Sequence, residues 1–200
     1  MNQQELAVFE WPNDASTLCL ENGLLVITVR TSLTAQRTDA RKHIRAVIQE
    51  VLAILLNCPV SEIKLLSQAG QAIKLAHADH NIGLSISHEL GLSLAAINMH
   101  GHIGIDLIAI DSIPENAELL ILATEYLGEK VAEYISNQPA EAQKSAFARA
   151  WTIFESSMKL KGEALVEWSA ARDAQLKNIS SIRLNLAEGY IGALAYEKQS

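Results

Sequence analysis

Residues 147–162 read Phe-Ala-Arg-Ala-Trp-Thr-Ile-Phe-Glu-Ser-Ser-Met-Lys-Leu-Lys-Gly. Large apolar side chains recur in this stretch at helical spacing, namely Phe147, Trp151, Phe154 and Met158, so it is expected to belong to a helix from about 140 to 161. Gly162 supplies a left-handed end to that helix, and Lys159 and Lys161 lie in its last turn, where the helix dipole favours cations. Trp151, Glu155 and Lys159 share a second face. Taken alone, Glu155 and Lys159 are an ordinary i,i+4 pair on an amphipathic core helix.

The composition limits the class of protein. The chain has 200 residues, of which 49% are hydrophobic and 20% charged, as in a globular protein with a sizeable core. Its net charge of −7 argues against a general nucleic-acid binder, which needs a clustered basic surface. A local basic cluster leaves room for a confined anionic ligand: Arg37, Arg41, Lys42, His43 and Arg45.

The cysteines and the first residues indicate the compartment. Cys19 and Cys58 are the only cysteines, too few for a disulfide framework and without the spacing of a zinc site. The opening Met1-Asn-Gln-Gln-Glu5 lacks the basic and apolar regions of an export signal, and no apolar run reaches the length of a membrane span. We therefore expect a cytoplasmic protein with no membrane contact.

The remaining elements predict an α+β fold. The pattern favours a strand at 24–30, a helix at about 39–56 capped by Thr38-Asp39, and a strand–turn–strand hairpin at 82–99. The further expected elements are a short strand at 61–66 before a turn at 68–71, a buried strand at 102–111, helices at 115–126 and 128–136, and a closing hairpin at 180–196. This order predicts two α/β halves, residues 1–111 and 112–200, packed as one compact unit.

Asp106 is the anomaly in this pattern, because it lies within the apolar run His102-Ile-Gly-Ile-Asp-Leu-Ile-Ala-Ile110. A buried carboxylate without a partner is very costly, so a charged Asp106 requires a cation, a metal or several hydrogen-bond donors. The residue is therefore expected to face a ligand or a counter-ion.

Three segments, in order and spacing, resemble the signature motifs of the 4′-phosphopantetheinyl transferases, of the larger surfactin-synthetase-activating type. They are Leu84-Ser-Ile-Ser-His88, Gly104-Ile-Asp-Leu107 and Trp151-Thr-Ile-Phe-Glu-Ser-Ser-Met-Lys-Leu-Lys-Gly-Glu-Ala-Leu165. In the family they read roughly F-N-x-S-H-S, G-(I/V)-D-x-E and W-x-x-K-E-(A/S)-x-x-K-x-x-G-x-G-L. The closing Tyr190-Ile-Gly-Ala-Leu-Ala195 is similar to the family's last strand. The resemblance covers about 38–196, and the first forty residues are short and atypical for the family.

The resemblance implies a fold of two similar halves related by a pseudo-twofold axis, acting as a monomer. It implies transfer of the phosphopantetheine arm from coenzyme A to a serine of an apo carrier protein, in the presence of Mg²⁺. The carriers are the acyl, peptidyl or polyketide carrier proteins of fatty-acid, polyketide and nonribosomal-peptide biosynthesis.

The resemblance also implies roles for individual residues. Asp106 and Glu155 would bind Mg²⁺, and Glu155 could serve as general base toward the carrier serine. Lys159 would contact a coenzyme A phosphate and complete the catalytic set. Ser87 and His88 would bind the nucleotide 3′-phosphate region, and Arg41 or Arg45 would be the family's N-terminal coenzyme A-binding arginine.

The chain departs from the family pattern at four positions. Phe154 stands where the family has lysine before its glutamate, and Ile108 replaces the second acid of G-I-D-x-E. Glu89 follows His88 in place of serine, and Gln71 occurs where a lysine is usual. Two hypotheses follow: an active transferase, or a degenerate member that binds coenzyme A or a carrier domain without catalysis.

Overall fold

The computed structural model describes residues 6–34, 36–66, 72–76 and 81–197. Its strands are β1 (Val8–Glu10), β2 (Leu24–Arg30), β3 (Leu65–Leu66), β4 (Lys74–Leu75), β5 (Gly83–Glu89), β6 (Leu92–Asn98), β7 (Ile103–Ala109), β8 (Ser180–Leu184) and β9 (Tyr190–Tyr196). Its helices are α1 (Arg37–Leu56), α2 (Asn116–Leu122), α3 (Glu129–Ser136), α4 (Ala140–Lys161) and α5 (Ala170–Leu176), with a π-helical turn at Ala123–Leu127 between α2 and α3. The α+β class is thus confirmed.

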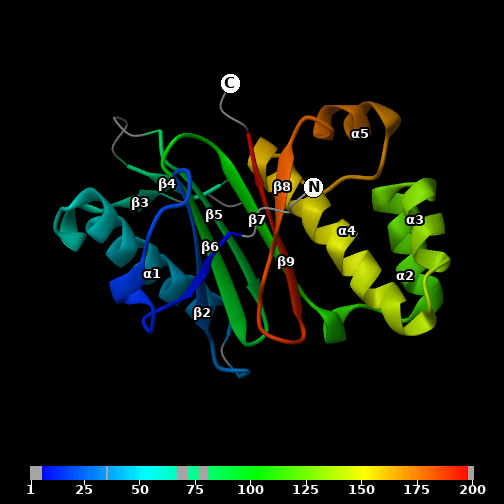
Figure 1. Ribbon diagram of the computed structural model, residues 1–200, viewed down its shortest axis with the longest axis horizontal. Helices are drawn as coiled ribbons and strands as arrows, with labels where there is room; N and C mark the ends of the chain where they lie inside the picture. Colours follow the sequence, from blue (N-terminus) through cyan, green and yellow to red (C-terminus); the bar gives the residue numbers. More distant parts are fainter. Residues whose placement is uncertain (1–5, 35, 67–71, 77–80, 198–200) are drawn as a thin grey trace.

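Two larger sheets form the centre of the molecule (Figure 1). One has the order β1-β2-β6-β5 and the other β7-β9-β8. All of these neighbours are antiparallel except β1 and β2. The small pair β3-β4 stands apart from both sheets.

The same strand order occurs twice along the chain. In the first part a strand (β2) leads to a long helix (α1) and then to the hairpin β5–β6, and β2 pairs with β6. In the second part β7 leads to α4 and to the hairpin β8–β9, and β7 pairs with β9. This repeat agrees with the two similar halves expected from the family, while the twofold axis itself stays a prediction. The boundary at 111/112 also stays a prediction, and it leaves β7 in the half opposite to its partner β9.

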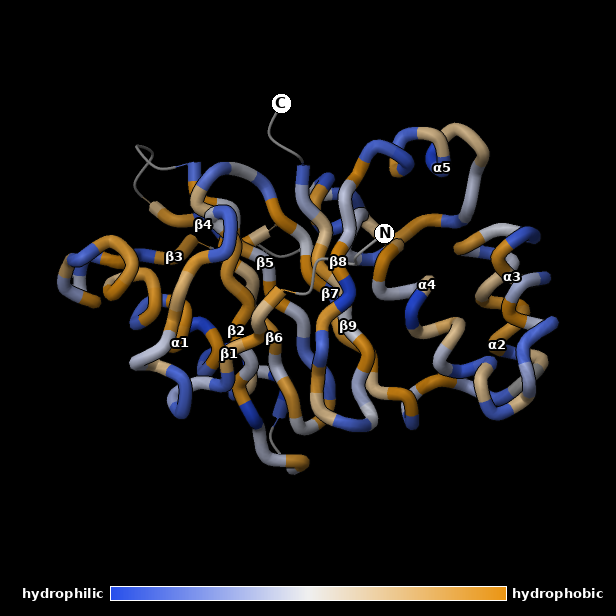
Figure 2. The backbone as a smooth tube through the Cα atoms, viewed as in Figure 1, coloured by the Kyte–Doolittle hydropathy of each residue, from blue (hydrophilic) through white to orange (hydrophobic). Residues whose placement is uncertain are grey.

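Three apolar clusters hold the layers together. The first lies between α1 and the β2–β6–β5 sheet and includes Ile44, Ile48 and Ile97. The second lies between the two sheets, where Val26 and Leu94 meet Ile105 and Leu194. The third joins α4 to the α2–α3 region. Figure 2 shows this distribution as apolar strands in the middle of the molecule and mixed, more polar helices at both sides.

Most predicted elements lie within a few residues of their expected places, and the exceptions are local. The expected cap of α1 is wrong: the helix begins at Arg37 after Gln36, and no side chain caps its first turn. The expected strand at 61–66 shrinks to β3, because Val60–Glu62 form a 3-10 turn instead. In the hairpin expected at 82–99, β5 continues through His88 to Glu89, and the turn is confined to Leu90 and Gly91. The turn expected at 68–71, with Gln71, lies entirely outside the described residues, which do not include 67–71.

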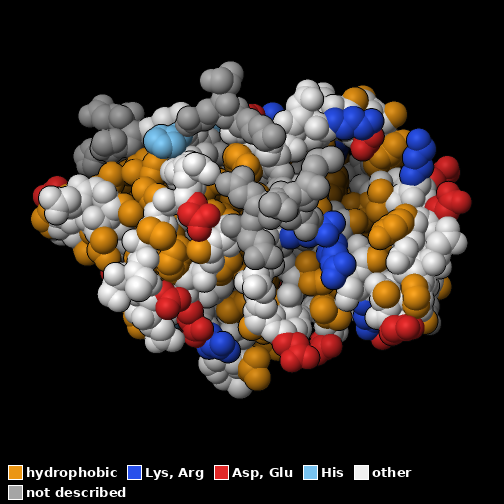
Figure 3. Space-filling model, in the orientation of Figure 1, with side chains coloured by type: hydrophobic (Ala, Val, Ile, Leu, Met, Phe, Trp, Pro, Cys, Tyr) orange, Lys and Arg blue, Asp and Glu red, His pale blue; other side chains and the backbone are white. Residues whose placement is uncertain are grey.

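Charges on the outside are mixed. On the face shown in Figure 3, Lys and Arg side chains are interspersed with Asp and Glu side chains. Within the described ranges no helix is long and apolar enough to cross a membrane.

Candidate functional site

The site is built where α4 crosses β7. Gly104 makes this crossing possible: a Cβ atom at that position would overlap the backbone of Ser156 and approach the amide of Leu160. The helix therefore lies directly on the strand. As a result Glu155 and Lys159 are brought to the level of Asp106, two residues after Gly104 on β7.

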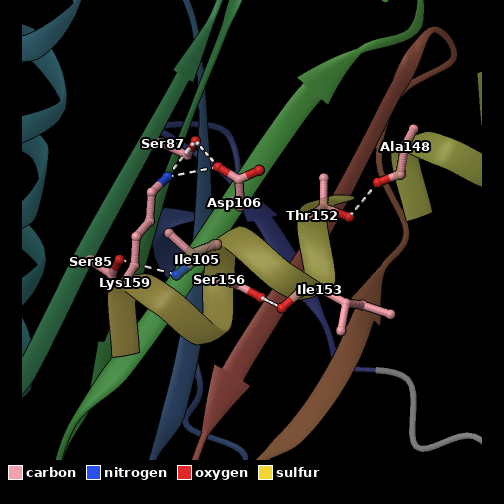
Figure 4. A network of polar contacts seen from close by, with 9 residues as sticks. All are labelled: Ser85, Ser87, Ile105, Asp106, Ala148, Thr152, Ile153, Ser156 and Lys159. Carbon is pink, nitrogen blue, oxygen red and sulfur yellow. Dashed lines mark hydrogen bonds and ion pairs between the residues drawn. The ribbon is translucent and has the colours of Figure 1, made fainter. Parts of the chain in front are cut away.

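The side of α4 that faces the sheet is made of small residues. Ala148, Thr152 and Ser156 recur at a spacing of four and are completely buried. Thr152 Oγ1 donates to the carbonyl of Ala148 and Ser156 Oγ to that of Ile153 (Figure 4), so neither hydroxyl needs a partner in the sheet. The large apolar residues that identified the helix in the sequence instead face α2 and α3: Phe147, Phe154 and Met158, flanked by Trp151.

Asp106 is buried, as its sequence context predicted, with 3% of its side chain exposed. Its counter-ion is Lys159, whose Nζ lies 2.7 Å from Asp106 Oδ1. Ser87 on β5 completes the network: its Oγ donates to the same Oδ1 over 3.0 Å and lies 3.2 Å from Lys159 Nζ. Figure 4 shows the lysine extending from α4 to reach both groups. The hydrogen bonds that the Asp106 carboxylate accepts from Ser87 and Lys159 both end on its Oδ1 atom.

This placement differs in part from the expected roles. Ser87 was expected to bind nucleotide phosphate and Lys159 a coenzyme A phosphate, yet in the structure both bind Asp106. The anomaly of a carboxylate in an apolar strand is therefore resolved by a lysine that is distant in sequence and adjacent in space.

Glu155 is the second carboxyl group at this site. Burial and the neighbouring Asp106 carboxylate raise the pKa of Glu155 to about 7, even though the Lys159 ammonium opposes the rise. Glu89, on β5, adds a third negative charge that acts in the same direction. A carboxyl group that titrates near neutrality can accept a proton at physiological pH.

His88 lies beside a group of cations. Its Nδ1 is 2.8 Å from Ser93 Oγ. Burial, followed by the positive charges of Arg41, Arg37 and Lys159, lowers the pKa of His88 to about 4. The imidazole is therefore neutral at pH 7. The three cations that add to the effect of burial make the local potential positive, which suits an anionic ligand.

The two candidate arginines are distinguished by this environment. Arg41 and Arg37, one turn apart on α1, both act on His88, whereas Arg45 does not contribute to its pKa shift. Arg37 was not among the expected site residues. Its i,i+4 spacing from Arg41 was the available signal, since that spacing places both on one helix face.

The departures from the motif pattern have different consequences. Phe154 is 9% exposed and belongs to the apolar cluster between α4 and α2–α3. Its ring meets that of Trp151 edge-on, with 6.4 Å between the two ring centroids. Ile108 also packs against that cluster. Glu89 lies close enough to the site for Asp106 and Arg37 to act on its pKa, which burial raises above its ordinary value.

Two carboxyl groups of the site are of the kind that binds Mg²⁺. Asp106 on β7 and Glu155 on α4 offer hard oxygen ligands, and they lie close enough for the Asp106 carboxylate to raise the pKa of Glu155. Among the described residues no three His, Cys, Asp or Glu side chains are grouped as a complete metal cage. Because Mg²⁺ commonly takes one or two carboxylates and completes its shell with phosphates and water, the pair fits such a shared site.

Comparisons with known proteins agree with the C-terminal motifs. The model of the 4′-phosphopantetheinyl transferase superfamily matches residues 102–198. This segment contains Asp106, Glu155 and Lys159, and it does not extend to Ser87, His88 or Arg41. A search of curated proteins finds no match to the chain.

Proposed function

We propose that the protein, whose residues 102–198 match the model of the 4′-phosphopantetheinyl transferase superfamily, transfers the 4′-phosphopantetheine arm of coenzyme A to a serine of an apo carrier protein. The observation that carries the proposal is the convergence of Asp106, Glu155 and Lys159 on one site at the α4–β7 crossing. This site combines an anion-binding cation, a proton acceptor and oxygen ligands, the groups that phosphoryl transfer requires.

In the proposed reaction the serine hydroxyl oxygen of the carrier forms a bond to the β-phosphorus of coenzyme A. The bond from that phosphorus to the bridging oxygen breaks, and 3′,5′-adenosine bisphosphate leaves with the bonding electrons. The serine proton passes to Glu155, whose pKa of about 7 leaves a useful fraction ionised at neutral pH.

The other residues of the site bind and orient. Lys159 supplies a flexible ammonium for the phosphates. Arg37 and Arg41 place positive charge around His88, which favours the nucleotide end of coenzyme A. Asp106 and Glu155 would hold Mg²⁺, which when bound neutralises charge on the transferred phosphoryl group.

A second function keeps the binding and omits the transfer. It is favoured by the burial of Phe154 in the α4–α2–α3 cluster, because that position cannot supply a cation to the reacting phosphate. In this alternative the protein binds coenzyme A or a carrier domain as an interaction protein.

The test is incubation of the protein with coenzyme A, MgCl₂ and a panel of apo acyl and peptidyl carrier proteins, followed by intact-mass analysis. We expect a carrier to gain the mass of one phosphopantetheine arm. D106N and E155Q should abolish the gain, while K161M, which removes an exposed lysine of the same helix, should retain it. Bound coenzyme A with no mass gain on any carrier would favour the alternative.

A further inference from the structure

The position of Lys159 calls for an explanation beyond phosphate binding. Its ammonium is held at 2.7 Å by Asp106 Oδ1 and at 3.2 Å by Ser87 Oγ. A lysine committed to these two partners cannot at the same time be the free cation that a coenzyme A phosphate would meet.

The two partners of this ion pair differ in their freedom. Asp106 is on β7 with 3% of its side chain exposed, whereas 33% of the Lys159 side chain is exposed. A buried carboxylate that loses its counter-ion is strongly destabilising. Lys159 has a long flexible stem and a partly exposed side chain, so separating the pair is unfavourable mainly for Asp106.

On the basis of the proposed function, we propose that Lys159 is an exchangeable counter-ion. In the structure it neutralises Asp106. With coenzyme A bound, Lys159 would leave Asp106 for a coenzyme A phosphate, and the Asp106 carboxylate would then be free to hold Mg²⁺. Each ligand thereby facilitates the binding of the other, so the two are expected to bind cooperatively.

Ser87 sets the strength of the ion pair between Lys159 and Asp106. Its hydroxyl donates to Asp106 and lies next to the ammonium, so it stabilises the pair without carrying charge. Ser85 provides the matched comparison, since it is equally buried on β5 but its Oγ accepts a hydrogen bond from the amide of Ile105, 3.0 Å away (Figure 4). Ser87 is thus a positioning residue for Lys159, and Ser85 joins β5 to β7.

The first experiment is titration calorimetry of the whole protein with MgCl₂ alone, with coenzyme A alone and with each in the presence of the other, in the absence of carrier. Each ligand is expected to increase the affinity of the protein for the other by about tenfold, within the usual range of such coupling. Independent binding of the two ligands overturns the exchange. A wild-type protein that does not bind coenzyme A at all overturns the proposed function instead, which keeps the two failures distinguishable.

Because a metal that touches phosphate also couples the two ligands directly, variants must separate the causes. S87A leaves all charges in place and weakens the hold on Lys159, so Mg²⁺ alone should bind several-fold more tightly than to the wild type, while S85A should leave this affinity unchanged. K159M should bind Mg²⁺ alone more tightly and lose most of the coupling, whereas K161M should keep it. Unchanged Mg²⁺ affinity in S87A, or undiminished coupling in K159M, overturns the proposal. Circular dichroism establishes that each variant is folded. K159Q, which also removes the ammonium but keeps a polar side chain, replaces K159M if that variant is unfolded and should likewise lose the coupling.

Discussion

The backbone of Ser156 on α4 lies against Gly104 on β7 with no room for a Cβ atom between them. This contact fixes the distance between helix and strand, and so determines that the ammonium of Lys159 reaches the carboxylate of Asp106. The geometry of the candidate site therefore depends on a residue that has no side chain.

The first prediction concerns that contact. G104A should lower the free energy of unfolding by at least about 2 kcal/mol, because the added methyl group forces α4 away from β7. Transfer activity should fall together with stability. The measurements are urea unfolding and the carrier mass assay. G162A is the control, with a cost of about 1 kcal/mol from its left-handed backbone and open space around the new methyl group. An equal loss of unfolding free energy in G104A and G162A would contradict the close contact between Gly104 and the backbone of Ser156.

The second prediction concerns Phe154. F154K introduces the lysine found in the family motif but places it in an apolar cluster, so it should destabilise the fold by about 3 kcal/mol or more. F154L, which keeps an apolar side chain, should cost about 1 kcal/mol. Thermal unfolding measures the stability of both variants, and the carrier mass assay measures their transfer activity. A stable F154K with faster transfer would show that this position can turn toward the site.

The third prediction follows from Glu155. The folded-state pKa of about 7 lies above the ordinary value of 4.5, so the folded protein holds the proton more tightly than the unfolded chain does. Stability from this group is therefore complete below about pH 4.5 and is lost as the pH rises through 7. E155Q should be more stable than the wild type at pH 8, by on the order of 2–3 kcal/mol, and nearly equal to it at pH 4.5. Urea unfolding across this range measures the difference, and parallel pH profiles would refute it.

The fourth prediction concerns His88, with the opposite pH dependence. Its folded-state pKa of about 4 lies below the ordinary value of 6.5, so the unfolded chain takes up the proton first. The stability contribution is complete above pH 6.5 and is lost as the pH falls toward 4. H88Q should therefore lose less stability than the wild type between pH 6.5 and 4. An imidazole that titrates near 6.5 by NMR in the folded wild type would rule this out.

The fifth prediction compares the two members of the buried pair. K159M leaves the Asp106 carboxylate buried without its cation and should lower the free energy of unfolding by about 1–3 kcal/mol, less than for a fully buried pair because the lysine is partly exposed. D106N leaves a solvated ammonium and should cost less than K159M. Denaturant unfolding of both variants under identical conditions measures this asymmetry. The reverse order would mean that Lys159 depends on Asp106 more than Asp106 depends on Lys159.

Much of the candidate site could be located from the sequence. Asp106 was identifiable because a carboxylate in a buried strand needs a partner, and Glu155 and Lys159 because they share a helix face. The identity of the partner could not be predicted, because Lys159 is 53 positions away from Asp106 and only the packing of α4 on β7 brings the two together. The same packing determined the orientation of Phe154, which in the sequence was only one more large residue of the apolar pattern.

The sequence by itself determined most of the helices and strands, since the periods of apolar residues along the chain specify them locally. It also determined which residue types are available for phosphate and metal chemistry. Only the tertiary structure decided that Lys159 neutralises Asp106, that Arg37 joins Arg41 near His88, and that Phe154 faces away from the site. The physical reason is that burial and electrostatic pairing depend on distances between elements, and these distances are set by side-chain volume at contacts such as Gly104 against Ser156.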